Sequence, residues 1–115
     1  MTIKEKVSGD VATLSLKGDL VSEADTSKLK EKIHSLVSDN IKRVVLDLAG
    51  VEFINSSGLG TLISSLTTLK NSGGDLRLAG LGERVENLFV ITKLVKVFET
   101  YETVDRALSS FSLTK

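Results

Sequence analysis

Apolar and polar positions alternate with a period of two at the start of the chain. Residues 2–7 place lysines and other polar side chains between apolar ones, residues 8–10 carry the turn sequence Ser-Gly-Asp, and residues 11–16 alternate again. This pattern predicts a β-hairpin, and the lysines of its first strand are typical of the edge of a sheet.

The period then changes to that of a helix. Over residues 24–38 an apolar stripe recurs at helical intervals and is formed by Leu29, Ile33, Leu36 and Val37. Ser22, followed by Asp25, has the arrangement of a helix N-cap. His34 is the only histidine and has no carboxylate or thiolate partner near it in sequence, so we interpret it as a structural or solvated side chain.

A second strand and helix occupy the middle of the chain. A nearly unbroken apolar run predicts a strand buried on both faces, and it consists of Val44, Val45, Leu46 and Leu48. From residue 59 to residue 70 the helical period returns, with a predicted buried stripe of Leu59, Leu62, Ile63, Leu66 and Leu69.

The C-terminal third continues the alternation of strands and helices. Residues 75–79 predict a strand, and the next helix is lined by Val85, Leu88, Phe89 and Thr92. We expect a last short strand made by Val95, Val97 and Phe98. A final helix is predicted after the cap Thr103, through Ala107, Leu108 and Phe111, and we expect residues 112–115 to be a frayed end.

The resulting order, β-β-α-β-α-β-α-β-α, predicts the fold class. Strands that alternate with helices imply an α/β domain with a mixed, mostly parallel sheet, in which the N-terminal hairpin supplies one antiparallel pair. About four helices pack on this sheet. The 115 residues fit one domain spanning residues 1–115.

The junction between the buried strand and the second helix concentrates the candidate chemistry. Asn55, Ser56 and Ser57 are all good N-cap residues, which places two hydroxyls at a helix N-terminus, where donors point outward. Gly58 and Gly60 are poor helix formers and suggest a tight turn or a close approach of another backbone. Display of a hydroxyl for modification and plain helix capping both remain open from this pattern.

Composition and charge narrow the function classes. Lys and Arg total 15, as do Asp and Glu, so no bulk charge draws the chain to nucleic acid or an anionic membrane. The chain has no cysteine, which excludes disulfides and thiolate metal sites and suits a reducing cytoplasm. No apolar run approaches the length of a membrane span, and the N-terminus lacks the apolar segment of a signal peptide.

Several kinds of catalytic or ligand site lack the residues that they need. The sequence around Ser56 is not a serine hydrolase elbow, and His34 is the only candidate base. No His, Asp or Glu residues stand at a metal-ligand spacing. Gly80-Leu81-Gly82 follows a strand and opens a helix as a dinucleotide fingerprint would, but Val85 replaces its third glycine. We therefore expect no enzyme, no metal and no cofactor, and a ligand at residues 80–82 stays open.

Four segments are familiar in combination: residues 18–20, residues 44–48, residues 51–62 with the core Ser-Ser-Gly-Leu-Gly, and residues 73–76. Together they resemble the bacterial anti-sigma factor antagonists of the STAS-domain family, over nearly the whole chain. The resemblance implies a cytoplasmic regulator of transcription that works by partner switching. In this family the unphosphorylated protein binds a serine-kinase anti-sigma factor, the kinase phosphorylates it with ATP, and a serine phosphatase reverses the modification.

Carried onto this chain, the resemblance makes Ser56 the phosphoacceptor, with Ser57 as the second choice. It implies a partner-binding surface formed by Asp19, Leu20, Val21, Asn55, Ser56, Ser57, Gly58, Leu59 and Gly60. We expect a monomer or a weakly associating dimer. Asn55 stands where the family usually has aspartate, and Val21 where many members have an acidic residue. The alternative is therefore a STAS-type nucleotide or small-ligand sensor that is not phosphorylated.

Overall fold

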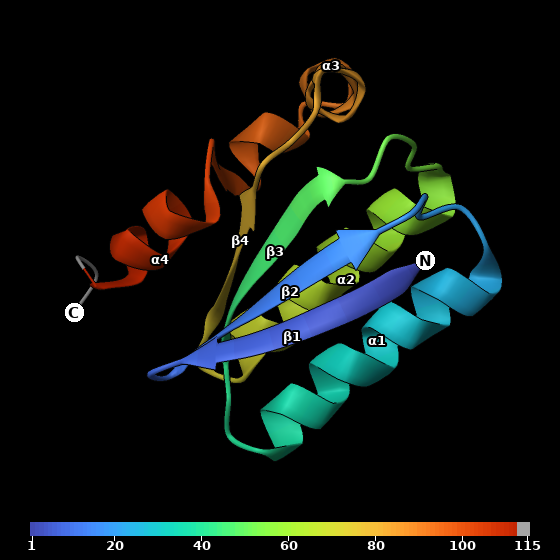
Figure 1. Cartoon of the computed structure of the whole chain (residues 1–115). Helices are drawn as coiled ribbons and strands as arrows, with labels where there is room; N and C mark the ends of the chain where they lie inside the picture. Colours follow the sequence, from blue (N-terminus) through green and yellow to red (C-terminus); the bar gives the residue numbers. More distant parts are fainter. Residues whose placement is uncertain (113–115) are drawn as a thin grey trace.

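A five-stranded sheet runs through the centre of the molecule in the order β1-β2-β3-β4-β5 (Figure 1). The computed structural model describes residues 1–112. The strands are β1 (Thr2–Ser8), β2 (Val11–Lys17), β3 (Arg43–Gly50), β4 (Asp75–Ala79) and β5 (Glu99–Tyr101). β1 and β2 form the predicted antiparallel hairpin with β1 at the edge, and all other neighbouring strands are parallel.

The helices cover both faces of this sheet. Among residues 1–112 they are α1 (Glu23–Ser38), α2 (Ser56–Asn71), α3 (Glu83–Ile91) and α4 (Val104–Ser112). Figure 1 shows α1 and α2 side by side along one side of the sheet and α4 on the other, where it contacts β3, β4 and β5. This arrangement confirms the predicted α/β class, the mostly parallel sheet and the number of helices.

β3 lies at the centre of the fold and is buried on both faces, as its apolar run predicted. Val44, Leu46 and Leu48 join the large core beneath the helices, while Val45 packs with Phe111 in the smaller core under α4. Because β3 is held from both sides, its C-terminal end is a rigid platform for the segment that follows it.

The structure confirms the predicted N-caps of α1 and α4. The Ser22 hydroxyl accepts a hydrogen bond from the backbone N–H of Asp25 and starts α1, and the Thr103 hydroxyl accepts one from Arg106 before α4. The Ser22 side chain is also the main cause of a lowered pKa of the Asp25 carboxyl. The frayed end was expected to begin at residue 112, but Ser112 is still helical, and residues 113–115 lie outside the described residues.

The predicted last strand was wrong. Leu94–Lys96 is a short 3-10 helix, and β5 begins only at Glu99. Phe98 turns into the core, where its ring lies 5.7 Å from that of Phe89. Strand pairing starts one residue later, where Glu99 lies opposite Arg77. These apolar residues therefore form a helical turn and a core contact rather than a strand.

The predicted stripe of α2 needs one correction as well. Leu62, Leu66 and Leu69 are buried, but Ile63 is 39% exposed. The small polar residues Thr61 and Ser65 are buried instead. Ser65 lies beside Ile33 in the groove between α1 and α2, where the two helices pack against each other. No helix in the described part of the chain is long and apolar enough to cross a membrane.

Candidate functional site

The N-terminus of α2 meets the loop between β2 and α1 at one end of the sheet. An isolated parallel bridge between Leu20 and Ile54 joins the two segments. The N–H of Leu20 donates to the carbonyl of Phe53 at 3.0 Å, and the N–H of Phe53 donates to the Asp19 carboxylate at 3.2 Å. We call the combined surface, residues 19–21 with residues 55–60, the α2 N-terminal surface.

Asn55 is the N-cap of α2. It has an extended backbone, with φ −93° and ψ −176°, and its Oδ1 accepts a hydrogen bond from the N–H of Gly58 at 2.9 Å. Its Nδ2 donates to the carbonyl of Val21 at 2.8 Å, so one side chain contacts both segments of the surface. The capping role that the sequence left open among three residues thus belongs to Asn55.

Ser56 and Ser57 occupy the first two positions of α2 and are exposed. Within residues 1–112 neither hydroxyl makes a hydrogen bond, because the cap is supplied by Asn55. The first N–H groups of a helix have no partners inside the helix, and the helix dipole makes this end favourable for negative charge. The N-terminus of α2 therefore exposes two hydroxyls without hydrogen bonds to the described residues, at a place where an added negative charge is tolerated.

The two glycines of the surface have different roles. A Cβ on Gly58 would lie 2.4 Å from the carbonyl oxygen of Leu20 and 2.7 Å from the Ile54 side chain, so only glycine allows the loop to approach the helix this closely. A Cβ on Gly60 would meet no atom within 4 Å, because this residue faces open space.

The other sequence-derived site residues divide by exposure. Leu20 is fully buried and Leu59 packs partly against the core, so their side chains anchor the surface from below. Val21 is 44% exposed and Asp19 is partly exposed beside Phe53. The residues named from the resemblance are thus brought together in space, with some supporting the surface and others forming it.

Sequence reasoning missed a contact between Phe53 and Arg84. The Phe53 ring is 46% exposed, and the Arg84 guanidinium lies over it at 4.7 Å from the ring centroid. Arg84 belongs to α3, so this pair extends the surface toward a third segment. An aromatic residue two positions before the cap was the only available signal, and its partner lies 31 positions later in the chain.

The turn at residues 80–82 has poor electrostatics for a phosphate ligand. Gly80 has φ +70° and Gly82 is the N-cap of α3, with no side-chain cap bond. The open cavity beside it, about 440 Å³, includes both Glu52 and Glu83 in its lining together with Arg84. Two carboxylates against one guanidinium leave the cavity negative, which opposes a phosphate.

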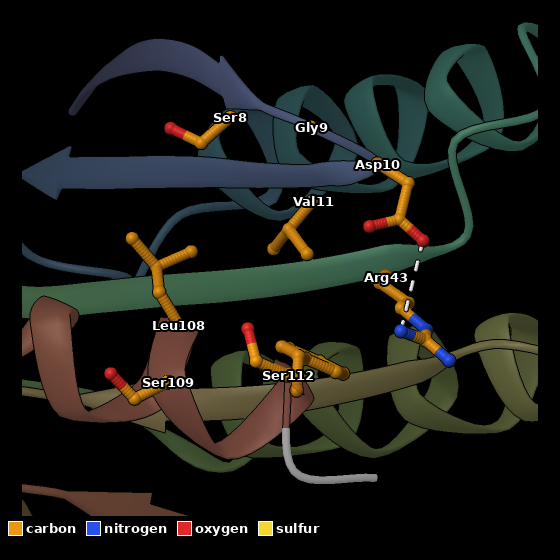
Figure 2. Close-up of a pocket in the computed structure, with 9 residues that line it drawn as sticks. Ser8, Gly9, Asp10, Val11, Arg43, Leu108, Ser109 and Ser112 are labelled. Atoms are coloured by element: carbon orange, nitrogen blue, oxygen red, sulfur yellow. Dashed lines mark ion pairs between the residues drawn. The ribbon is translucent and has the colours of Figure 1, made fainter. Parts of the chain in front are cut away.

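A larger cavity lies elsewhere, beside the hairpin turn and the beginning of β3 (Figure 2). It has a volume of about 650 Å³, and its charged side chains Asp10 and Arg43 pair with each other at 3.7 Å. His34 is exposed on α1, in the groove facing α2. Among residues 1–112 no group of three His, Cys, Asp or Glu residues could hold a metal ion.

Comparison with known proteins places these features in a family. The family model described as "STAS domain" matches residues 2–107. A solved structure from Thermotoga maritima has a TM-score of 0.86 and 25% identity, covering 94% of this chain and 92% of that one. A structure titled as an anti-sigma factor antagonist from Mycobacterium paratuberculosis has a TM-score of 0.82 and 28% identity, covering 95% and 92%.

The fold is also shared with the anti-sigma factor antagonist SpoIIAA, which has been solved without and with phosphate. The unphosphorylated form has a TM-score of 0.74 and 15% identity, with coverage of 96% of this chain and 98% of that one. The phosphorylated form has a TM-score of 0.75 and 16% identity, with coverage of 96% and 99%.

Proposed function

Because the chain belongs to the STAS domain family, we propose that it is an anti-sigma factor antagonist that binds a serine-kinase anti-sigma factor through the α2 N-terminal surface. Phosphorylation of Ser56 by that kinase, with ATP as the phosphate donor, ends the complex. A serine phosphatase restores the binding form. The similarity to the mycobacterial anti-sigma factor antagonist supports the class of partner.

One observation supports Ser56 as a phosphoacceptor. Its hydroxyl is exposed and makes no hydrogen bond within residues 1–112, although it is the first residue of α2, because Asn55 has taken over the cap. A kinase can therefore reach the hydroxyl without disturbing the fold. Ser57 is similarly exposed, and within the same residues its hydroxyl is also unbonded. The family resemblance, and not the geometry, makes it the second choice.

The phosphate acts at the interface rather than on the fold. A phosphoserine adds about −1.5 to −2 charges at pH 7. The N-terminus of α2 accommodates this charge through its free N–H groups and dipole. A partner that covers the same surface must bury the dianion without a matching cation, which is costly enough to dissociate the complex.

Phosphopeptide mapping tests this proposal. The protein is isolated from its own cells under growth, starvation and stress, as wild type and as Ser56→Ala and Ser57→Ala variants. We expect phosphate on Ser56 in the wild type and in Ser57→Ala, and none in Ser56→Ala. Phosphate on Ser57 alone, or none under any condition, contradicts the proposed switch.

A variant that places a negative charge at residue 56 tests whether charge there prevents binding of the kinase. Ser56→Asp keeps or slightly raises the free energy of unfolding, by up to about 1 kcal/mol, because an acidic residue is favourable in the first turn of a helix. It loses binding to the kinase, which a pull-down with the unmodified protein identifies. Thr67→Asp adds the same charge on the exposed part of α2 and is expected to bind normally. Equal binding by wild type and Ser56→Asp would refute the interface mechanism.

A further inference from the structure

We propose that Asn55 is a positioning residue whose neutral carboxamide holds the loop of residues 19–21 against the N-terminus of α2, and that a carboxylate cannot replace it. The inference concerns the geometry of the α2 N-terminal surface and stands whether or not Ser56 is phosphorylated. Only its consequence for partner binding rests on the proposed function.

The two ends of the Asn55 side chain face groups of opposite character. Oδ1 meets the N–H of Gly58 at 2.9 Å, which requires an acceptor. Nδ2 meets the carbonyl oxygen of Val21 at 2.8 Å, which requires a donor. The carboxamide is the side-chain group that supplies an acceptor and a donor side by side at this length. The surroundings thus select asparagine by hydrogen-bond chemistry rather than by its N-cap preference alone.

Aspartate would satisfy only one of these two contacts. A carboxylate caps a helix well, so its bond from the Gly58 N–H would be kept. Its second oxygen would carry negative charge and face the Val21 carbonyl oxygen, where an ionised carboxylate has no proton to donate. Within residues 1–112 the Val21 carbonyl has no other hydrogen-bond partner. The contact would therefore change from a hydrogen bond to a repulsion.

The bond matters because the other contacts of the junction hold Asp19 and Leu20, through the bond from the Leu20 N–H to the Phe53 carbonyl at 3.0 Å and the bond from the Phe53 N–H to the Asp19 carboxylate at 3.2 Å. Leu20 and Ile54 form a single bridge rather than a ladder, and the bond from the Asn55 N–H to the Leu20 carbonyl is long, at 3.4 Å. Val21 itself is exposed and is not held by core packing. The Asn55 carboxamide is therefore the contact that fixes the exposed end of the loop relative to Ser56.

The resemblance gave Asn55 as a departure from the aspartate usual in the family. The geometry points to a different use of the position in this chain. Asparagine lacks the negative charge of aspartate but makes a second hydrogen bond, and that bond holds the loop that carries Val21. Asn55 then acts on a partner mainly through the shape of the surface that it holds in place.

Amide hydrogen exchange measured by NMR tests the proposal with the full chain and three variants. Asn55→Asp and Asn55→Ser both keep an acceptor for the helix cap and both lose the donor to Val21, but they differ in charge. Asn55→Ala loses both contacts. The reporters are the N–H groups of Leu20 and residue 55 for the loop and Gly58 for the cap, each compared with Leu46 in the centre of β3.

We expect the loop reporters to exchange about fivefold faster in all three variants, the factor that corresponds to loss of one hydrogen bond of roughly 1 kcal/mol. The Gly58 N–H should stay protected in Asn55→Asp and Asn55→Ser and lose protection in Asn55→Ala. Unchanged loop exchange in Asn55→Ser overturns the proposal, because that variant removes the donor without adding charge. Loop exchange that rises only in step with Leu46 also overturns it, since the effect is then global.

Failure of the proposed function would look different. If the loop loosens as expected while the variants bind the identified kinase as tightly as wild type, the role of Asn55 stands, but residues 19–21 are not part of the partner surface. If loop exchange is unchanged while Ser56→Asp abolishes binding, the switch stands and the proposed role of Asn55 is wrong.

Discussion

Gly58 and Gly60 look equivalent in the sequence, and the structure separates them. Both lie in the first turns of α2, and each is expected to weaken a helix. Gly58 is in contact with the loop, where a Cβ would fall 2.4 Å from the Leu20 carbonyl oxygen. Gly60 has no neighbour within reach of a Cβ. The same residue type is thus required at one position for a close approach and is free to change at the other.

This difference gives a paired prediction for stability. Gly58→Ala is expected to lower the free energy of unfolding by about 2–3 kcal/mol, because the methyl group forces the loop away from the helix. Gly60→Ala is expected to raise it by about 0.5–1 kcal/mol, because alanine is the better helix former and nothing obstructs it. Urea denaturation of both variants measures the two effects. Equal changes in the free energy of unfolding would show that the loop can move away from Gly58 without destabilising the fold.

At the residue scale, the sequence identified the candidate serines but not their environment. Three adjacent cap-type residues could each have started α2, and capping preferences do not separate Asn from Ser. The choice of Asn55 follows from its reach to Val21, which lies 34 positions earlier in the chain. Ser56 is left exposed by that long-range contact, which local pattern could not supply.

At the scale of the elements, the buried face of α2 contains a hydroxyl group that lowers the stability of the fold. Ser65 is 3% exposed, and its hydroxyl has no hydrogen-bond partner in the described structure. A buried hydroxyl without a partner loses its bonds to water and gains nothing in return. The small side chain suits the groove between α1 and α2, but its oxygen does not contribute to the packing there.

We therefore expect Ser65→Ala to raise the free energy of unfolding by about 1 kcal/mol, since it removes the unpaired hydroxyl and improves helix propensity. Ser64→Ala is the neighbouring control, because Ser64 is exposed and its hydroxyl bonds the carbonyl of Thr61. This control is expected to change stability by less than about 0.5 kcal/mol. Thermal and urea denaturation give both values, and a destabilised Ser65→Ala would indicate an unrecognised partner for the hydroxyl.

Most elements were predictable because their signals are local. The alternation in the hairpin, the helical period of α1 and the cap at Ser22 each depend on neighbours within a few residues. The prediction for the segment after α3 was wrong because its apolar residues are close together and follow neither the helical nor the strand period. Phe98 went to the core, whereas Val95 and Val97 remained exposed.

At the scale of the whole molecule, Arg77 joins α4 to the sheet. It is a buried residue of β4, and its side chain pairs with Asp75 at 3.4 Å and Glu99 at 3.1 Å. Its guanidinium also donates to the Ser110 hydroxyl at 2.6 Å and lies 4.1 Å from the centroid of the Phe111 ring. One side chain thereby connects β4, β5 and α4, which covers the face opposite α1 and α2.

Arg77→Met keeps an unbranched apolar side chain but removes the guanidinium group and its contacts. It is expected to lower the free energy of unfolding by about 2–3 kcal/mol, below the value for a fully buried pair because Glu99 is largely exposed. Amide exchange in α4 should rise more than in β3. Arg106→Ala, which removes an exposed pair with Glu102, should change stability by less than about 0.5 kcal/mol. Unchanged α4 exchange in Arg77→Met would show that apolar packing alone holds the helix.

The sequence by itself determined the order of strands and helices, the class of fold and the segment that carries the candidate serines. These features depend on periodicity, capping and turn residues, which act between close neighbours in the chain. The tertiary structure decided which residue caps α2, which glycine is indispensable, that Phe53 meets Arg84, and that Arg77 holds α4. Each of these depends on contacts between segments that are distant in the chain, such as the 33 positions between Arg77 and Ser110. Local patterns carry no information about which distant groups meet, because that depends on how the sheet and helices pack.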